Sequence, residues 1–245
     1  MIEFIEKEFR EQIKTQKLWL ITLVFIFFAV LSPILTKNLQ AIMKTTLGME
    51  LPPPLPVDSY LQFFKSVYQM GLLVFILFFM GCVAVEKEKG TAAMILSKPV
   101  SRLEFILSKY ISISAAAIFA LSVGGILCYG YTETLFEEAG SFWLFLKAMA
   151  CYTVFFLGSS AVIVLFSTLA KNQLYAGAAS AVVLIVMSFT SQVDMGKYFF
   201  TSFLGLATTY LQGGSGEIVI PIISSAVIIG VCLVAAWRIF EYQEI

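Results

Sequence analysis

Six apolar stretches, each long enough to cross a lipid bilayer, constrain this chain more than any other feature. A helix needs about 20 apolar residues to cross the hydrocarbon core at a rise of about 1.5 Å per residue. Only 13% of the 245 residues are charged, whereas charged residues make up about a quarter of a typical soluble domain. The six predicted spans are residues 18–35, 63–85, 103–131, 144–169, 174–193 and 218–237. The sequence therefore predicts an all-α membrane protein in which residues 1–245 form one transmembrane domain.

A seventh apolar stretch, residues 198–211, is too short for a span and is interrupted by Gly205, Thr208 and Thr209. A stretch this apolar is unsuited to a free loop, and irregular backbone within a membrane must be buried in protein or line a cavity. We expect a re-entrant or interfacial helix immediately before the last span.

The distribution of basic residues predicts the orientation of the chain. If the N-terminus lies inside, the inner segments hold eleven of the 16 Lys and Arg residues and the outer segments hold five. Cytoplasmic loops of membrane proteins carry the excess of Lys and Arg. Both termini, and the segment between the second and third spans, are therefore expected in the cytoplasm.

Residues 1–16 form a separate amphipathic element before the first span. Ile5, Phe9 and Ile13 recur at helical spacing and give one apolar stripe. Glu3 with Lys7, and Glu6 with Arg10, are i,i+4 pairs on the polar side. We expect a helix that lies on the inner membrane surface, either as an interfacial anchor or as a docking surface for a cytoplasmic partner.

Residues 86–102 place a charged, proline-containing segment between two apolar runs. Gly90 and Thr91 can break and re-cap the chain, and Pro99 disfavours helix at the residue before it. Ser101 and Glu104 form the S-x-x-E pattern of a capping box that begins the third span, with Arg102 expected to face the lipid headgroups. The short piece between these breaks carries an apolar knob of three residues, Met94, Ile95 and Leu96. This piece is either an amphipathic surface helix or an element through which a partner moves the second and third spans.

Several kinds of chemistry are excluded by what the sequence lacks. The chain has no histidine, its four cysteines are isolated in apolar runs, and no phosphate-binding G-K-[ST] motif occurs, so we expect neither a metal site nor ATP hydrolysis in this chain. The balance of 16 basic and 16 acidic residues gives no reason to expect nucleic acid as a partner. Lysines such as Lys109 are placed at span ends, where they can snorkel, so the spans lack the acidic relay typical of ion-coupled transporters. Energy for any transport would have to come from another polypeptide.

The segment 86–102 resembles the ABC-2 type permease family, the membrane subunits of type V ATP-binding cassette transporters. It reads E-K-E-K-G-T at 86–91 and L-S-K-P-V-S-R at 96–102, and the third span begins with L-S-K-Y. An aromatic and acidic tail, Phe240 to Tyr242, adds to the likeness, although the basic cluster of many relatives is missing there. The residues that match the family pattern are Glu86, Glu88, Gly90, Thr91, Pro99 and Arg102.

The resemblance implies an assembly of two permeases and two ATPase subunits. The segment around Met94, Ile95 and Leu96 would be a coupling helix seated in a cleft of the ATPase, which would bind ATP and Mg²⁺, and residues 1–16 would be the connecting helix beside it. Residues 198–211, with Phe199, Phe200 and Phe203, would lie at the outer gate of a path between two permease copies, identical or related. The family also implies the inner membrane of a prokaryote.

Other functions remain open from sequence alone. A membrane scaffold or assembly factor that transports nothing is the main alternative, followed by a passive channel and, least favoured, a membrane-embedded enzyme. Relatives handle lipids, peptides, drugs, sodium and precursors of metal centres, and no residue selects among these substrates.

Overall fold

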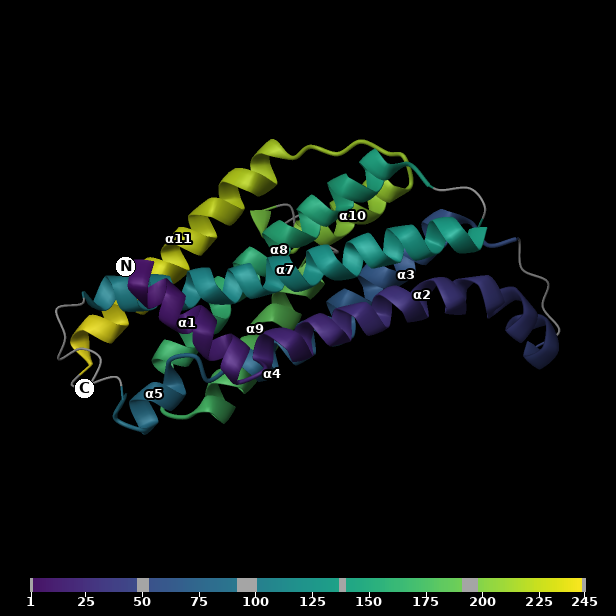
Figure 1. The fold of residues 1–245 in the computed structure, drawn as a ribbon. Coiled ribbons are helices and arrows are strands. Elements are labelled where there is room, and N and C mark those ends of the chain that lie inside the picture. The colour runs from purple at the N-terminus through teal and green to yellow at the C-terminus, as the bar shows by residue number, and fades with distance from the viewer. Residues whose placement is uncertain (1, 48–52, 92–100, 137–139, 191–197, 244–245) are drawn as a thin grey trace.

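The computed structural model describes residues 2–47, 53–91, 101–136, 140–190 and 198–243, and every regular element in these ranges is a helix (Figure 1). The predicted all-α fold is confirmed for this part of the chain. The elements are α1 (Ile2–Lys14), α2 (Lys17–Leu47), α3 (Pro56–Ser66), the π-helical turn η1 (Val67–Gly71), α4 (Leu72–Phe79), α5 (Ala84–Glu88), α7 (Arg102–Phe136), α8 (Phe142–Leu169), α9 (Gln173–Thr190), α10 (Ser202–Leu211) and α11 (Val219–Tyr242).

Five of the helical stretches are long and apolar enough to cross a membrane. They are Lys17–Leu39, Pro56–Glu88, Arg102–Phe136, Phe142–Leu169 and Val219–Tyr242. The helix at the place of the predicted fifth span, α9, is apolar but has only 18 residues and is not among the five. The described part of the chain therefore holds five candidate spans, which indicate a multi-pass membrane protein, and the count of six stays a prediction.

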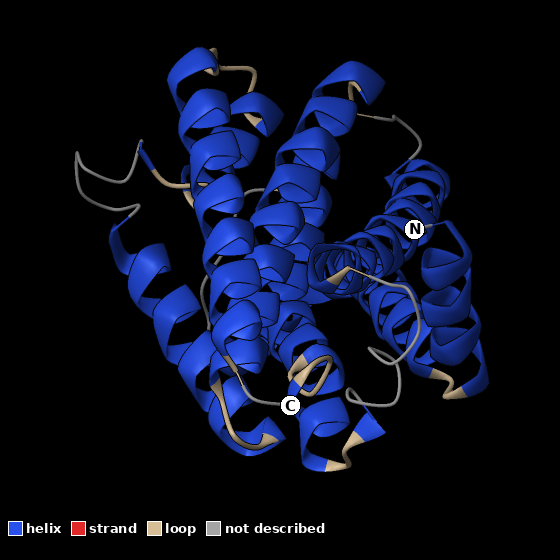
Figure 2. Cartoon of the chain, turned by 90° about the vertical axis from the view of Figure 1, so that its left-hand side faces the viewer, coloured by secondary structure: helices blue, strands red, loops and turns tan. Residues whose placement is uncertain are grey.

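The two ends of the described chain lie at the same end of the bundle. In Figure 1 the N-terminal helix α1, the last turn of α11, the short helix α5 and the start of α7 lie together. Figure 2 looks at the bundle from this side, and both termini face the viewer. We call this the terminal end of the bundle.

The second predicted span, residues 63–85, is not one continuous helix. Its helical part begins earlier, at Pro56, where the Leu55 backbone N–H donates to the Asp58 carboxylate at 2.9 Å. A turn over residues 80–83 then separates α4 from α5. The backbone N–H groups of Val83 and Ala84, which lack helical partners here, donate to Ser167 Oγ of α8 at 2.9 and 3.0 Å. The break is therefore stabilised by a hydroxyl from another helix.

The core is built largely from aromatic rings where α2, α4, α7 and α8 meet. Phe25 of α2 is fully buried, and its ring lies 5.7 Å from that of Phe156 of α8. Gly124 allows α7 to approach α2, because a Cβ atom there would lie 3.1 Å from Phe25 Cβ and 3.2 Å from the Phe25 carbonyl oxygen. Close backbone approach of this kind is the usual means of holding membrane helices together.

We expect Gly124→Leu to destabilise the bundle by about 1–3 kcal/mol, because the added side chain overlaps the backbone of α2 and forces the helices apart. Gly130→Leu is the matched control on the same helix, since a Cβ atom at residue 130 meets no atom within 4 Å. Thermal unfolding of both variants in the same detergent measures the difference. Equal melting temperatures for the two variants would show that this contact contributes nothing to stability.

The segment predicted as re-entrant or interfacial forms α10 after a short turn at residues 198–201. Phe200 and Phe203 are buried and Phe199 is half-buried. The Phe200 ring lies 6.0 Å from that of Phe155 and covers Gly158, so the start of this segment packs against the middle of α8. A helix exists here as expected, whereas its re-entrant nature and its role as an outer gate stay predictions.

Candidate functional site at the terminal end of the bundle

A buried cluster of charges joins three helices at the terminal end. Lys109 Nζ of α7 lies 2.7 Å from Glu8 Oε2 of α1 and 2.5 Å from Glu86 Oε1 of α5. The side chains of Lys109 and Glu8 are 4% and 6% exposed, and that of Glu86 is 13% exposed. We call Glu8, Glu86 and Lys109 the ion-pair junction.

Helical spacing places further polar groups beside the junction. Gln12 lies one turn after Glu8 on the same face of α1, and Ser112 lies one turn after Lys109 on α7. The Gln12 amide donates to Ser112 Oγ at 2.9 Å. These two contacts, one turn apart, fix both the position and the rotation of α1 against α7.

Burial makes the junction sensitive to the loss of any member. Two carboxylates and one ammonium group removed from water carry a large desolvation cost, which only their mutual attraction offsets. Removing one partner would leave an uncompensated buried charge. Lys7, whose side chain is 42% exposed, lies 3.3 Å from Glu8 and 3.8 Å from Glu86 and supplies a second, more solvated positive charge.

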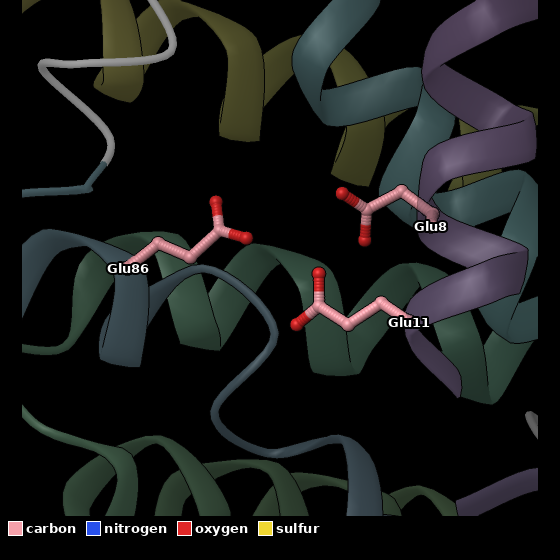
Figure 3. Close-up of side chains that lie close together, drawn as sticks. All are labelled: Glu8, Glu11 and Glu86. Atoms are coloured by element: carbon pink, nitrogen blue, oxygen red, sulfur yellow. The ribbon is translucent and has the colours of Figure 1, made fainter. Parts of the chain in front are cut away.

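Three carboxylates converge from two helices at this place (Figure 3). Glu8 and Glu11 project from α1 and Glu86 projects toward them from α5, with carboxylate oxygens within 4.8 Å of one another. This spacing would suit a cation, but the Lys109 ammonium group already lies against Glu8 and Glu86. We therefore interpret the cluster as an ion-pair network.

A cavity of about 260 Å³ opens beside the junction. Its lining combines Glu8, Gln12, Glu86 and Lys109 with apolar side chains of α4, the following turn and α7. Two buried oxygen atoms, Gln12 Oε1 and Glu86 Oε2, have no hydrogen-bond partner among the described residues. The packing around this cavity is thus less complete than in the aromatic core.

The predicted coupling segment leaves the junction directly after Glu86. Glu88, Gly90 and Thr91 are exposed, and Gly90 adopts a φ of +69°, the left-handed conformation with which glycine commonly ends a helix. Thr91 Oγ1 donates to the Glu86 carbonyl at 3.2 Å. The break predicted at Gly90 is confirmed. Met94, Ile95, Leu96 and Pro99 lie outside the described residues.

The far side of the segment begins α7 as the capping box predicts. The Ser101 N–H donates to Glu104 Oε2, and the Glu104 N–H donates to Ser101 Oγ, both at 3.2 Å. The prediction that Arg102 faces the headgroups is wrong, because its guanidinium group donates to backbone carbonyls at the end of α11. The last carbonyls of a helix carry partial negative charge and stabilise a cation placed beside them.

The apolar stripe predicted for the N-terminal helix does not form the face that packs on the bundle. Ile5 and Phe9 are half-buried and Ile13 is 45% exposed, whereas Glu8 and Gln12 are buried. The helix docks through polar side chains because α7 offers Lys109 and Ser112 as partners. The side chains of the apolar stripe are therefore available to contact an apolar environment such as lipid.

Hydropathy alone could not identify Lys109 as part of the site. Its position seven residues into the third span predicts a snorkelling side chain, and this prediction is wrong because Lys109 is 3% exposed. The available signal was that Lys109 is followed by Ser112 and Ser114 inside an apolar run. Polar residues clustered at one depth of a span indicate a polar partner at that depth.

Two comparisons with known proteins place the chain among transmembrane proteins. The model of the family described as ABC-2 family transporter proteins matches residues 2–197. The chain is also 29% identical over 164 residues to the uncharacterized transmembrane protein YxlG of Bacillus subtilis (strain 168). That alignment covers 63% of this chain and 62% of the relative, so the chain matches less than two thirds of the relative's length.

Proposed function

Since the chain belongs to the ABC-2 family of transporter proteins, we propose that it is the permease subunit of an ATP-binding cassette exporter, driven by a separate ATPase subunit. The ion-pair junction is the observation that carries this proposal. Glu86, the last junction residue before the exposed segment, is paired with Lys109 of the third span, and Lys109 is in turn paired with Glu8 of the N-terminal helix. A force applied to the segment is therefore transmitted to two other helices.

In this proposal residues 86–102 form the coupling element, with Met94, Ile95 and Leu96 in contact with the ATPase. Glu88 and Thr91 are exposed and stand where the chain leaves the bundle, so they are accessible to a partner. Ser101 and Arg102 return the chain to α7. ATP and Mg²⁺ are bound by the partner, and this chain supplies the membrane path.

The topology favours α9 as a sixth span. Both termini lie at one end of the bundle, and a chain that begins and ends on the same side of a membrane crosses it an even number of times. Five crossings cannot give this result. The 18 residues of α9 would reach about 27 Å as a helix, close to the thickness of about 30 Å of the hydrocarbon core. With the excess of basic residues inside, the terminal end is cytoplasmic.

The working unit that we propose contains two permease copies and two ATPase subunits in the inner membrane of a prokaryote. The path lies between the permease copies, and the segment that carries Phe199, Phe200 and Phe203 closes its outer side. The burial of Phe200 against Gly158 supports a position within the bundle for this segment.

Co-purification tests the proposal. The full-length tagged chain, extracted from its native membrane in a mild detergent, is expected to bring down a soluble ATPase of the cassette type in a one-to-one ratio. Recovery of a folded chain without any ATPase, with unfolding monitored in the same sample, would contradict the proposal.

A further inference from the structure

The end of α11 is held by the two flanks of the coupling element. From the returning flank, Arg102 Nη1 donates to the carbonyls of Phe240 at 2.7 Å, Glu241 at 2.6 Å and Gln243 at 3.2 Å. From the leaving flank, Lys87 Nζ donates to Gln243 Oε1 at 3.2 Å. Residues more than 130 positions apart in the chain thus meet at one point.

Two further hydrogen bonds connect Gln243 and Lys87 to the end of α8. Gln243 Nε2 donates to the Thr168 carbonyl at 3.2 Å, and Lys87 Nζ donates to the same carbonyl, which is near the end of α8. Beneath the polar groups, the rings of Phe105 and Phe240 are stacked with centroids 5.0 Å apart and planes 6° apart, and both side chains are fully buried. We call Lys87, Arg102 and Gln243, with the Phe105–Phe240 pair, the C-terminal clamp.

The clamp satisfies a specific physical need. The last carbonyls of a helix have no partners within the helix, and the helix dipole gives them partial negative charge. One guanidinium nitrogen shared by three such carbonyls both caps α11 and fixes its direction. Since α11 follows the outer segment α10 in the chain, the clamp is a direct connection between the coupling element and the helix that comes after that segment.

The geometry points to Arg102 as a positioning residue that makes the cytoplasmic end of α11 move with the coupling element. This inference rests on the proposed function, because it names the route by which motion of the coupling element would reach the outer side of the protein through α11. It is independent of the ion-pair junction, which connects the same element to α1 and α7. Motion of the coupling element would thus reach α1 and α7 through the ion-pair junction and α11 through the C-terminal clamp.

Amide hydrogen exchange of residues 236–243, measured on the full chain in lipid nanodiscs, tests the clamp itself. Arg102→Gln is expected to speed exchange in this segment by about tenfold, because the last turn loses its cap and opens more often. Arg102→Lys is expected to remain within about threefold of wild type, since an ammonium group offers three N–H donors to the same carbonyls. Arg238→Gln is the matched control, because exposed Arg238 lies on the same turn and, among the described residues, contacts only its neighbours Glu241, at 3.3 Å, and Trp237.

The coupling role is tested on the complex with its ATPase, with and without ATP and vanadate. The nucleotide is expected to change exchange at residues 236–243 in wild type and in Arg238→Gln, and to leave Arg102→Gln unchanged. In the first experiment, the inference is overturned if Arg102→Gln exchanges as slowly as wild type, or if Arg238→Gln or Arg102→Lys speeds exchange as much as Arg102→Gln does. In the second experiment, it is overturned if the nucleotide still changes exchange at residues 236–243 in Arg102→Gln. Failure to find any ATPase would instead overturn the proposed function and with it the coupling role, while the first experiment would still decide whether Arg102 caps α11.

Discussion

Replacing Lys109 by methionine is expected to lower the free energy of unfolding by about 3–5 kcal/mol, a value typical of breaking a buried ion pair. Methionine is an unbranched side chain only one heavy atom shorter than lysine, so most of the loss comes from the charge. Glu8 and Glu86 would remain buried, with only the more exposed Lys7 ammonium group near them. The measurement is the thermal or denaturant-induced unfolding of the purified chain in one detergent.

Two further variants separate the buried charge from charge in general. Lys7→Met removes a positive charge from the same network but from a side chain that is 42% exposed, so we expect a change below about 1 kcal/mol. The triple variant Lys109→Met, Glu8→Gln, Glu86→Gln should recover most of the lost stability, because no unpaired charge remains. If the Lys109→Met protein were as stable as wild type, the claim that the ion-pair junction stabilises the bundle would be wrong.

The second large effect is expected at the apolar knob of the coupling element. Ile95→Asp should reduce ATP hydrolysis by the complex more than tenfold and leave the unfolding of the permease unchanged. An unpaired carboxylate in an apolar contact costs several kcal/mol unless the partners separate, and each 1.4 kcal/mol is about a tenfold change in binding.

The conservative variant Ile95→Leu serves as the control, since it keeps the volume and the apolar character of the side chain. It should retain at least about half of the wild-type hydrolysis rate. If Ile95→Asp still binds the ATPase and supports full hydrolysis, the knob does not lie in the contact between the subunits.

Local signals in the sequence were sufficient wherever a single turn decides the structure. The capping box at Ser101 and Glu104 and the helix end at Gly90 depend on residues at most three positions apart, and both were predicted correctly. The apolar runs likewise predicted the helical fold, because a chain in lipid must satisfy its backbone hydrogen bonds within each segment.

Contacts between distant residues were beyond such reasoning. Ser167 stabilises a break in the second predicted span that lies over 80 residues earlier in the chain, and a serine inside an apolar run gives no indication of this. The sequence alone places Lys109 and Arg102 at the lipid boundary. The carboxylates that bind Lys109 come from α1 and α5, and the carbonyls that bind Arg102 come from the end of α11, so neither set of partners lies nearby in the sequence. Their roles depend on the tertiary arrangement, which hydropathy and spacing do not specify.

Photocross-linking from residue 95 tests most directly whether a separate ATPase acts on this chain through the coupling element. A photoreactive amino acid replaces Ile95 in the full-length protein in its native membrane, and the cross-linked product is identified by mass spectrometry. The account predicts a single adduct with a soluble ATPase, obtained when the probe is at residue 95 and lost when it is moved to Val227, an exposed residue of α11. Adducts with lipid alone, or labelling of residue 95 by a membrane-impermeant reagent added from outside, would contradict it.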